Sequence, residues 1–186
     1  MNHTFLILPL LLLFISTSCD DNQHIRHYRI EKEISPEISI QQTSVASDIN
    51  WTSPSNWISS TGSSMRIGSF TVPYSNGEGD LSVIKLGGTA GGLAPNINRW
   101  RGQLNLEPNT EEDIQKYIQM GESPMGSFQW LTILNSENHQ TAFIASIFQT
   151  HTHTIFVKLS ASQSGILELE KEFLNFCKSF TMDASK

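Results

Sequence analysis

The C-terminal part of the chain constrains its fold most, because strand-like segments there lead into one strongly amphipathic helix. Residues 165–180, GILELEKEFLNFCKSF, place apolar side chains at helical spacing along one side. This stripe consists of Ile166, Leu169, Phe173, Phe176, Cys177 and Phe180. Three apolar segments of strand length precede it, at 128–135, 141–150 and 153–161. The combination predicts a sheet with the helix packed on it.

A hairpin and two further helices are predicted upstream. Residues 63–73 and 81–88 are strand-like, and the Gly-rich and Asn-rich stretch 75–80 forms the turn between them. In the first strand the alternation predicts two opposite sides, Met65, Ile67 and Ser69 against Arg66, Gly68 and Phe70. A helical stripe of Leu93, Ile97, Trp100 and Leu104 follows in residues 93–105, and Thr110 is the predicted N-cap of the next helix. Residues 121–127, GESPMGS, are predicted to end that helix.

This order of elements predicts one α+β domain over residues 47–183. Its helices are expected to pack on a mostly antiparallel sheet, as an α/β/α sandwich. Trp51 and Trp57, six residues apart around Pro54, are expected to close an edge of the core rather than to bind a sugar.

The N-terminal segment looks like a secretory signal with a lipidation site. Residues 1–18 hold an apolar run too short to cross a bilayer core, and small residues lead directly into Cys19. This pattern resembles the lipobox of bacterial lipoproteins, in which the Cys becomes the lipidated N-terminus, and palmitate is one of the acyl groups expected there. The alternative is an ordinary cleaved signal, because Ser16 stands where that family usually has Leu and no Lys or Arg precedes the run. Residues 19–46 are polar and mixed in charge, which is typical of a flexible tether.

The charge balance excludes some classes of partner. The formal net charge is −6, and Lys and Arg are scattered along the chain. Nucleic acids and anionic lipid surfaces need clustered positive charge, so neither is an expected partner of the folded domain. The membrane contact is expected through the N-terminal lipid, facing the periplasm or the cell surface. Acidic residues directly after the Cys, here Asp20 and Asp21, fit retention at the inner membrane as well as export to the cell surface, so either membrane can hold the lipid.

The stretch from Gly87 to Leu104 is the strongest candidate for a binding site. Its glycines, including Gly91 and Gly92, lead into a helix N-terminus, where backbone N–H groups bind anions, but they lack the Lys of a phosphate loop. A tight strand-to-helix turn is the favoured interpretation. Polar side chains without an acidic residue then surround Trp100. The candidate binding residues are Asn96, Asn98, Arg99, Arg101 and Gln103, and a solvated helix face is the alternative.

No reaction is indicated by the remaining polar residues. His151 and His153 alternate near a strand, without a Cys, Asp or Glu nearby to complete a zinc site. The Ser-rich runs lack a nucleophile-elbow motif, and no carboxylate pair stands out for acid–base chemistry. Cys177 lies on the packed side of its helix and is expected to be inert. We expect no catalytic residue, metal or cofactor, and a binding protein is favoured over an enzyme.

Several motifs together resemble a group of uncharacterised bacterial lipoproteins. They are WxxPxxW at 51–57, MRIGSF at 65–70, LGGxxGG at 86–92, NINRWRGQL at 96–104 and the closing FLNFCKSF. The order of elements is also similar to the PsbP-like sandwich, in topology only. The resemblance implies a fold and an envelope location without an activity. We therefore expect a lipid-anchored envelope protein that acts as a binding or assembly module for another envelope component. The alternative is an envelope enzyme or small-anion-binding domain that uses the glycines of residues 87–92 and the helix face with Arg99 and Arg101.

Overall fold

The structure is a computed structural model that describes residues 48–63 and 65–183. The predicted signal, the lipidated Cys19 and the tether lie outside the described residues. A seven-stranded, fully antiparallel sheet in the order β2-β3-β4-β8-β7-β6-β5 forms the centre of the domain. Its strands are β2 (Ile58–Ser59), β3 (Arg66–Tyr74), β4 (Gly77–Gly87), β5 (Gln119–Ser123), β6 (Gly126–Ile133), β7 (Ala142–Gln149) and β8 (His153–Ala161).

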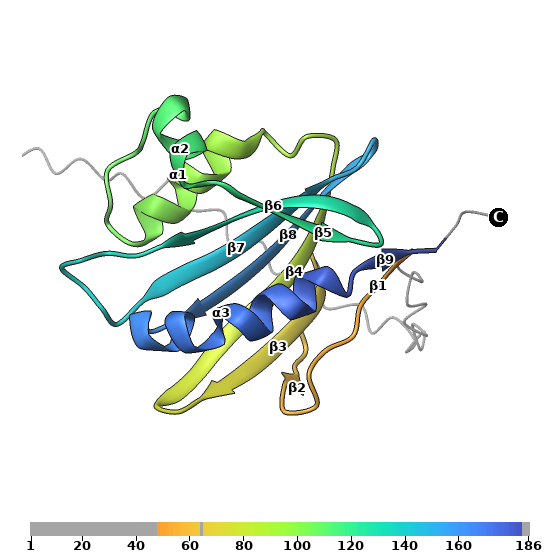
Figure 1. Ribbon diagram of the computed structural model, residues 1–186, viewed down its shortest axis with the longest axis horizontal. Helices are drawn as coiled ribbons and strands as arrows, with labels where there is room; N and C mark the ends of the chain where they lie inside the picture. The colour runs from red at the N-terminus through yellow and green to blue at the C-terminus, as the bar shows by residue number, and fades with distance from the viewer. Residues whose placement is uncertain (1–47, 64, 184–186) are drawn as a thin grey trace, which may run out of the picture. The chain divides into compact units, whose positions relative to one another are not determined.

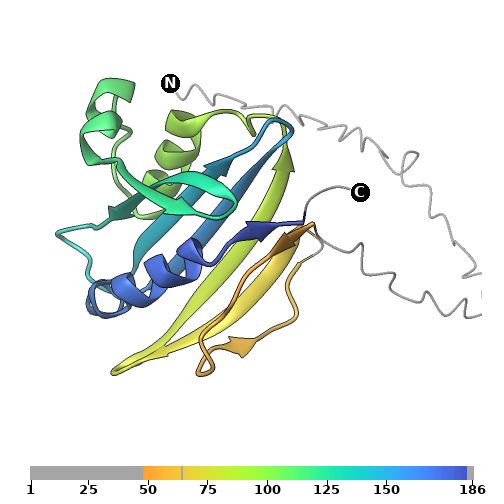
Figure 2. The same cartoon turned by 45° about the vertical axis from the view of Figure 1, so that its right-hand side comes forward.

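Three helices cover the sheet within the described residues. They are α1 (Leu93–Gln103), α2 (Glu111–Tyr117) and α3 (Gln163–Lys178). Helix α3 packs on one face, and α1 and α2 pack on the other, as the two views together show (Figure 1, Figure 2). A short separate ladder pairs β1 (Ile49–Asn50) with β9 (Thr181–Met182). The prediction of an antiparallel α+β sandwich is therefore confirmed.

The face under α3 carries the larger core, and it is rich in aromatic rings. Phe176 lies at its centre, with ring centroids 4.9 Å from Trp57, 5.2 Å from Phe180 and 5.8 Å from Phe70. Trp51 stacks on Phe180 at 5.3 Å. The two tryptophans thus close a core edge, as predicted. All six residues of the predicted α3 stripe are buried.

Local signals explain where the helices begin. The Thr110 side chain accepts a hydrogen bond from the Asp113 backbone N–H, and three acidic residues occupy the first turn of α2, next to the positive helix end. Ser162 caps α3 in the same way through the Gly165 N–H. The Thr110 cap was predicted from the sequence, whereas the start of α3 was located to within two residues from its apolar stripe alone.

Two expectations about the strands were wrong. The register of β3 shifts between Arg66 and Gly68, so Arg66 lies on the same face as Ser69 and donates to its hydroxyl at 2.9 Å. A β-bulge of this kind breaks the alternation on which the predicted sides depended.

The second error concerns residues 121–127, predicted as the end of a helix. They belong to the β5–β6 hairpin, which turns at residues 124 and 125. Strand β5 escaped detection because its residues, QMGES, carry no apolar alternation. Its backbone pairs with β6, and Gly121 leaves room for the Phe128 ring, which a Cβ there would meet at 2.3 Å.

Candidate functional site

The glycine-rich connection before α1 is a tight turn. Gly91 and Gly92 have φ values of +84° and +87°, in the left-handed region that favours glycine. The Gly92 N–H donates to the Thr89 carbonyl at 2.9 Å, so it is already paired. Asn96 is 2% exposed, and its side-chain amide donates to the carbonyl oxygens of Ala90 and Gly92. The side chain of Asn96 therefore holds the turn against the helix.

Asn98 also has a structural contact. Its side-chain amide donates to the Asn109 carbonyl at 2.9 Å, and its side-chain oxygen accepts from the Asn109 N–H at 2.8 Å. This reciprocal pair ties α1 to the segment that leads into α2. Of the five polar residues predicted around Trp100, Asn96 and Asn98 thus hold neighbouring backbone segments.

The other three point to opposite sides of the helix. Arg99 and Gln103 line a pocket between α1 and strands β3, β4 and β8, which we call the basic pocket. Arg101 lines a groove between α1, α2 and strand β6, which we call the edge groove. The five residues therefore do not form one continuous Arg-rich surface, and the two arginines belong to different hollows.

The basic pocket gathers three cations from distant parts of the sequence. Arg66 comes from β3, Arg99 from α1 and Lys158 from β8, around a volume of about 190 Å³. Gln103 adds a side-chain amide, and Trp100 and Phe156 give an apolar wall. These two rings meet edge to face, with centroids 5.8 Å apart.

Only part of this positive charge is neutralised. Arg66 forms a two-pronged ion pair with Asp80, with both N–O distances at 3.0 Å. Among the described residues, no carboxylate lies within ion-pair distance of Arg99 or Lys158. Arg99 donates instead to the Asn96 side-chain oxygen at 2.5 Å. Three cations and one carboxylate leave an excess of two positive charges.

Lys158 lies partly out of water and has no carboxylate partner among the described residues. It is half-buried, donates to the Gln103 side-chain oxygen at 3.0 Å, and places its ammonium 4.2 Å from the centre of the Phe143 ring. Burial lowers the pKa of Lys158 most; Asp80 acts in the opposite direction, and Arg66 and Arg99 lower it further.

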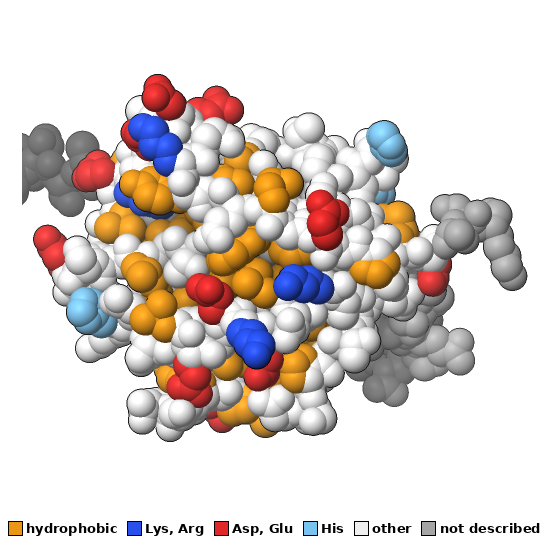
Figure 3. Space-filling model, in the orientation of Figure 1, with side chains coloured by type: hydrophobic (Ala, Val, Ile, Leu, Met, Phe, Trp, Pro, Cys, Tyr) orange, Lys and Arg blue, Asp and Glu red, His pale blue; other side chains and the backbone are white. Residues whose placement is uncertain are grey.

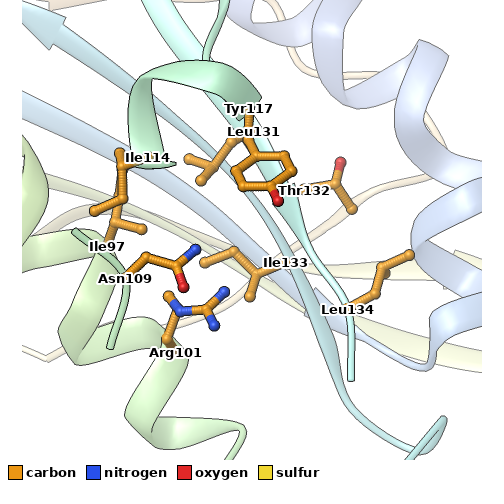
Figure 4. A pocket seen from close by; sticks show the side chains of 9 residues that line it. All are labelled: Ile97, Arg101, Asn109, Ile114, Tyr117, Leu131, Thr132, Ile133 and Leu134. Carbon is orange, nitrogen blue, oxygen red and sulfur yellow. The ribbon is translucent and has the colours of Figure 1, made fainter. Parts of the chain in front are cut away.

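The edge groove has a different character. Its volume is about 310 Å³, and its apolar lining includes Ile97, Ile114, Leu131 and Ile133. Figure 4 shows the side chains of Arg101, Asn109 and Tyr117 around the same opening. The Arg101 Nε donates to the Glu107 carbonyl at 2.8 Å, and no carboxylate of the described residues pairs with its guanidinium.

The remaining candidates lie outside both hollows. His151 is exposed and lines another depression, and the Nδ1 atom of His153 lies 2.8 Å from the Thr152 hydroxyl. Residues 48–63 and 65–183 contain no group of three or more His, Cys, Asp or Glu placed to hold a metal ion. Cys177 is buried beside the Ser146 hydroxyl at 3.1 Å, and burial raises the pKa of its thiol to about 12.

Reasoning from the sequence found Arg99 and Gln103 but missed Arg66 and Lys158. Arg66 was placed on a strand side without a role, and Lys158 was passed over as part of an apolar strand. One signal was available: Lys158 interrupts the strand HTIFVKLSA on the same side as Phe156. A charged side chain on the face of the sheet that a helix is expected to cover needs an opposite charge or a hydrogen-bond partner there.

The comparisons with known proteins concern the fold. No family model and no curated protein matches the chain. Among solved structures it is similar to cyanobacterial PsbP from Synechocystis sp. PCC 6803, at 16% identity, over 73% of this chain and 86% of that one, with a TM-score of 0.48. It is also similar to LpqN, involved in cell envelope biogenesis of Mycobacterium tuberculosis, at 15% identity, over 72% and 82% of the chains, with a TM-score of 0.46.

A third solved structure, from Bacteroides thetaiotaomicron, is similar at 10% identity, over 74% of this chain and 46% of that one, with a TM-score of 0.45. Likeness at this level carries no ligand or partner to this chain. None of the described helices has the length and apolar character needed to cross a bilayer.

Proposed function

We propose that this chain is a non-catalytic envelope protein whose domain binds a small anion in the basic pocket. The observation that carries the proposal is the half-buried Lys158 between Arg66 and Arg99, where cations outnumber carboxylates. Charge held away from water is costly unless it is paired. A bound anion would supply the missing partner.

The lining of the pocket indicates the class of ligand. Guanidinium and ammonium groups donate charge-assisted hydrogen bonds to carboxylate and phosphate oxygens, and the guanidinium of Arg99 offers a planar fork. The volume of about 190 Å³ suits a compact anion rather than a nucleotide. The Trp100 and Phe156 wall favours a ligand with a small apolar part beside its acidic group.

Binding without catalysis fits the polar groups that line the pocket. Ser82 is the hydroxyl among them, and it is 3% exposed and donates to the Lys158 carbonyl at 3.5 Å. The ammonium of Lys158 is directed to Gln103 rather than to that hydroxyl. These groups are arranged to hold negative charge, and none is paired as nucleophile and base.

The envelope location rests on the N-terminal sequence. An apolar signal followed by Cys19 supports cleavage and lipidation at that residue, and a polar stretch of about the length of 20–46 would separate the domain from the membrane. Globomycin treatment and mass spectrometry of the mature N-terminus test this part. Recovery of the protein without an acylated Cys19 would disprove anchoring and leave the pocket proposal standing.

The anion site is tested by thermal unfolding with inorganic phosphate, sulfate, acetate, succinate and glycerol phosphate, against sodium chloride at matched ionic strength. A ligand that binds the folded state stabilises it by RT ln(1 + [L]/Kd), about 2.7 kcal/mol at a hundredfold excess over Kd. We expect at least one anion to raise the melting temperature of the wild type by several degrees.

Matched variants locate the effect. Lys158→Met and Arg99→Gln should abolish the shift, whereas Arg101→Gln, on the same helix but in the edge groove, should retain it. The proposal fails if no anion gives a shift beyond that of sodium chloride, or if the shift persists in the Lys158→Met/Arg99→Gln double variant.

A further inference from the structure

Strand β6 has an outer edge that is only partly paired. Its neighbour β5 pairs with it from Gly126 as far as Trp130, and β6 continues to Ile133. Helix α2 ends at Tyr117, so the chain leaves the line of β5 just where this pairing stops. Residues 131–133 therefore pair with β7 on the inner side and, within residues 48–63 and 65–183, have no strand neighbour on the outer side.

The direction of the backbone groups on this edge follows from the hydrogen bonds of the neighbouring turn. In an antiparallel ladder, residues bond alternately to the left and right neighbours. The Thr150 N–H donates to the His153 carbonyl at the end of β7, so Phe148, Ser146 and Ile144 bond toward β8. The residues of β7 that lie between these three therefore bond toward β6. Their partners in β6 include Leu131 and Ile133.

Thr132 lies between these two partners, so its own backbone N–H and C=O point to the open edge. The Thr132 hydroxyl oxygen is buried and has no hydrogen-bond partner among the described groups. The edge groove is lined by four consecutive residues of the chain, Leu131 to Leu134. Neighbouring residues of a strand face opposite sides of a sheet, so a hollow lined by all four opens along the strand edge.

The surroundings of this edge are unusually apolar for a surface. Met120, within β5, is 62% exposed; Tyr117, which precedes β5, is 60% exposed, and Leu134, which follows β6, is 37% exposed. Figure 3 shows hydrophobic side chains gathered between α1–α2 and α3, over these two strands. Exposed apolar surface beside unpaired backbone groups is a template for an added strand.

We infer that the edge groove binds an extended peptide that adds as a strand along β6 at Thr132, with an apolar side chain against Tyr117 and a carboxylate on Arg101. The edge groove shares no lining residue with the basic pocket, so this inference stands apart from the proposed anion site.

The position of Arg101 determines where the carboxylate lies on the peptide. Arg101 belongs to α1, which covers the face of the sheet that carries Leu131 and Ile133. Side chains of an added strand project to the two faces, whereas its chain ends project along the edge. A group on α1 therefore meets a peptide side chain, an Asp or Glu. Alternate side chains share a face, so the ligand has an apolar residue and an acidic residue separated by one position.

Fluorescence anisotropy with two labelled hexapeptides, TTVTET and TTETVT, tests this inference. Both orders are needed because the added strand can run in either direction. We expect one of them to bind, and its Glu→Gln counterpart to bind about tenfold more weakly, since a hydrogen bond to a charged group is lost. Arg101→Gln should remove the preference for Glu over Gln, and Arg99→Gln, in the basic pocket, should leave it intact.

Amide hydrogen exchange distinguishes strand addition from other modes of binding. The bound peptide should slow exchange of the Thr132 N–H and leave that of Leu131, which already bonds to β7, unchanged. A peptide N-methylated at its central Thr should bind weakly. The inference is overturned if neither hexapeptide binds, if the Glu and Gln forms bind equally, or if the Thr132 N–H exchanges at the same rate with and without bound peptide.

Discussion

The two faces of the sheet are covered to very different extents. Under α3 a helix of 16 residues lies on interlocked aromatic rings, and the buried polar groups there, such as Ser146 and Cys177, contact each other. On the opposite face α1 and α2, of 11 and seven residues, leave hollows on both sides of α1. Arg99, Lys158 and Arg101, which have no carboxylate partner among the described residues, lie at these hollows.

This difference indicates where stability and binding are located. The closed face stabilises the domain through apolar burial, at roughly 1.5–3 kcal/mol for each large side chain. The incompletely covered face holds charge and unpaired strand edge, which add little to stability and are suited to ligands. Substitutions on the closed face should therefore unfold the domain, and substitutions at the hollows should change binding.

The largest effect is expected for Phe176→Ala on the closed face. The substitution removes a ring at the centre of the α3 core, which should lower the free energy of unfolding by about 3–5 kcal/mol. Urea denaturation followed by far-UV circular dichroism measures the loss. Leu167→Ala is the matched control, because Leu167 lies on the same helix and is 59% exposed; its effect should stay within about 0.5 kcal/mol. Equal losses in the two variants would contradict the packing described for α3.

Cys177 tests how tightly that face is closed. In a Cys19→Ser background it is the single thiol, and burial raises its pKa to about 12 from an ordinary 9.0. The raised pKa lowers the thiolate fraction and burial keeps the reagent away, so Ellman's reagent at pH 8 should react far more slowly in buffer than in urea. Because the folded state retains this proton, stability should fall as the pH rises from 9.0 toward about 12. Rapid labelling of the folded chain would show that the face opens.

Only a small effect on stability is expected at the basic pocket. Lys158→Met removes a half-buried charge and keeps most of the side-chain volume, so the free energy of unfolding should change by less than about 1 kcal/mol at pH 7. The pKa of Lys158 is lowered in the folded state, so the unfolded chain binds its proton more tightly. The wild type should therefore gain stability relative to the variant as the pH rises toward 10.5. A loss well above 1 kcal/mol would show that Lys158 serves the fold instead.

The extent of prediction differs between elements for a physical reason. The α3 stripe, the Thr110 cap and the strands β6 to β8 have strong local patterns, and each was located correctly. Strand β5 has no such pattern. It is held by backbone hydrogen bonds to β6, and every sequence carries the groups that form them. The sides of β3 were misassigned because a bulge changes the alternation without a mark in composition.

The same division holds for the candidate sites. The polar residues of α1 stand out in the sequence because six positions, 96–101, contain two Asn and two Arg with no acid. Their separation into helix anchors, a pocket residue and a groove residue depends on the direction in which each side chain leaves the helix.

Short-range periodicity and composition determine the order of most helices and strands, the apolar stripe of α3 and the signal-like N-terminus. These features can be recognised without the folded structure. The grouping of Arg66, Arg99 and Lys158 arises only when β3, α1 and β8 meet across the sheet. The edge at Thr132 beside Arg101 arises only because β5 pairs with part of β6 and α1 packs near the rest. Local patterns reflect hydrogen bonding and burial within a few residues. A binding site depends on contacts between distant segments, which come together only in the folded sheet.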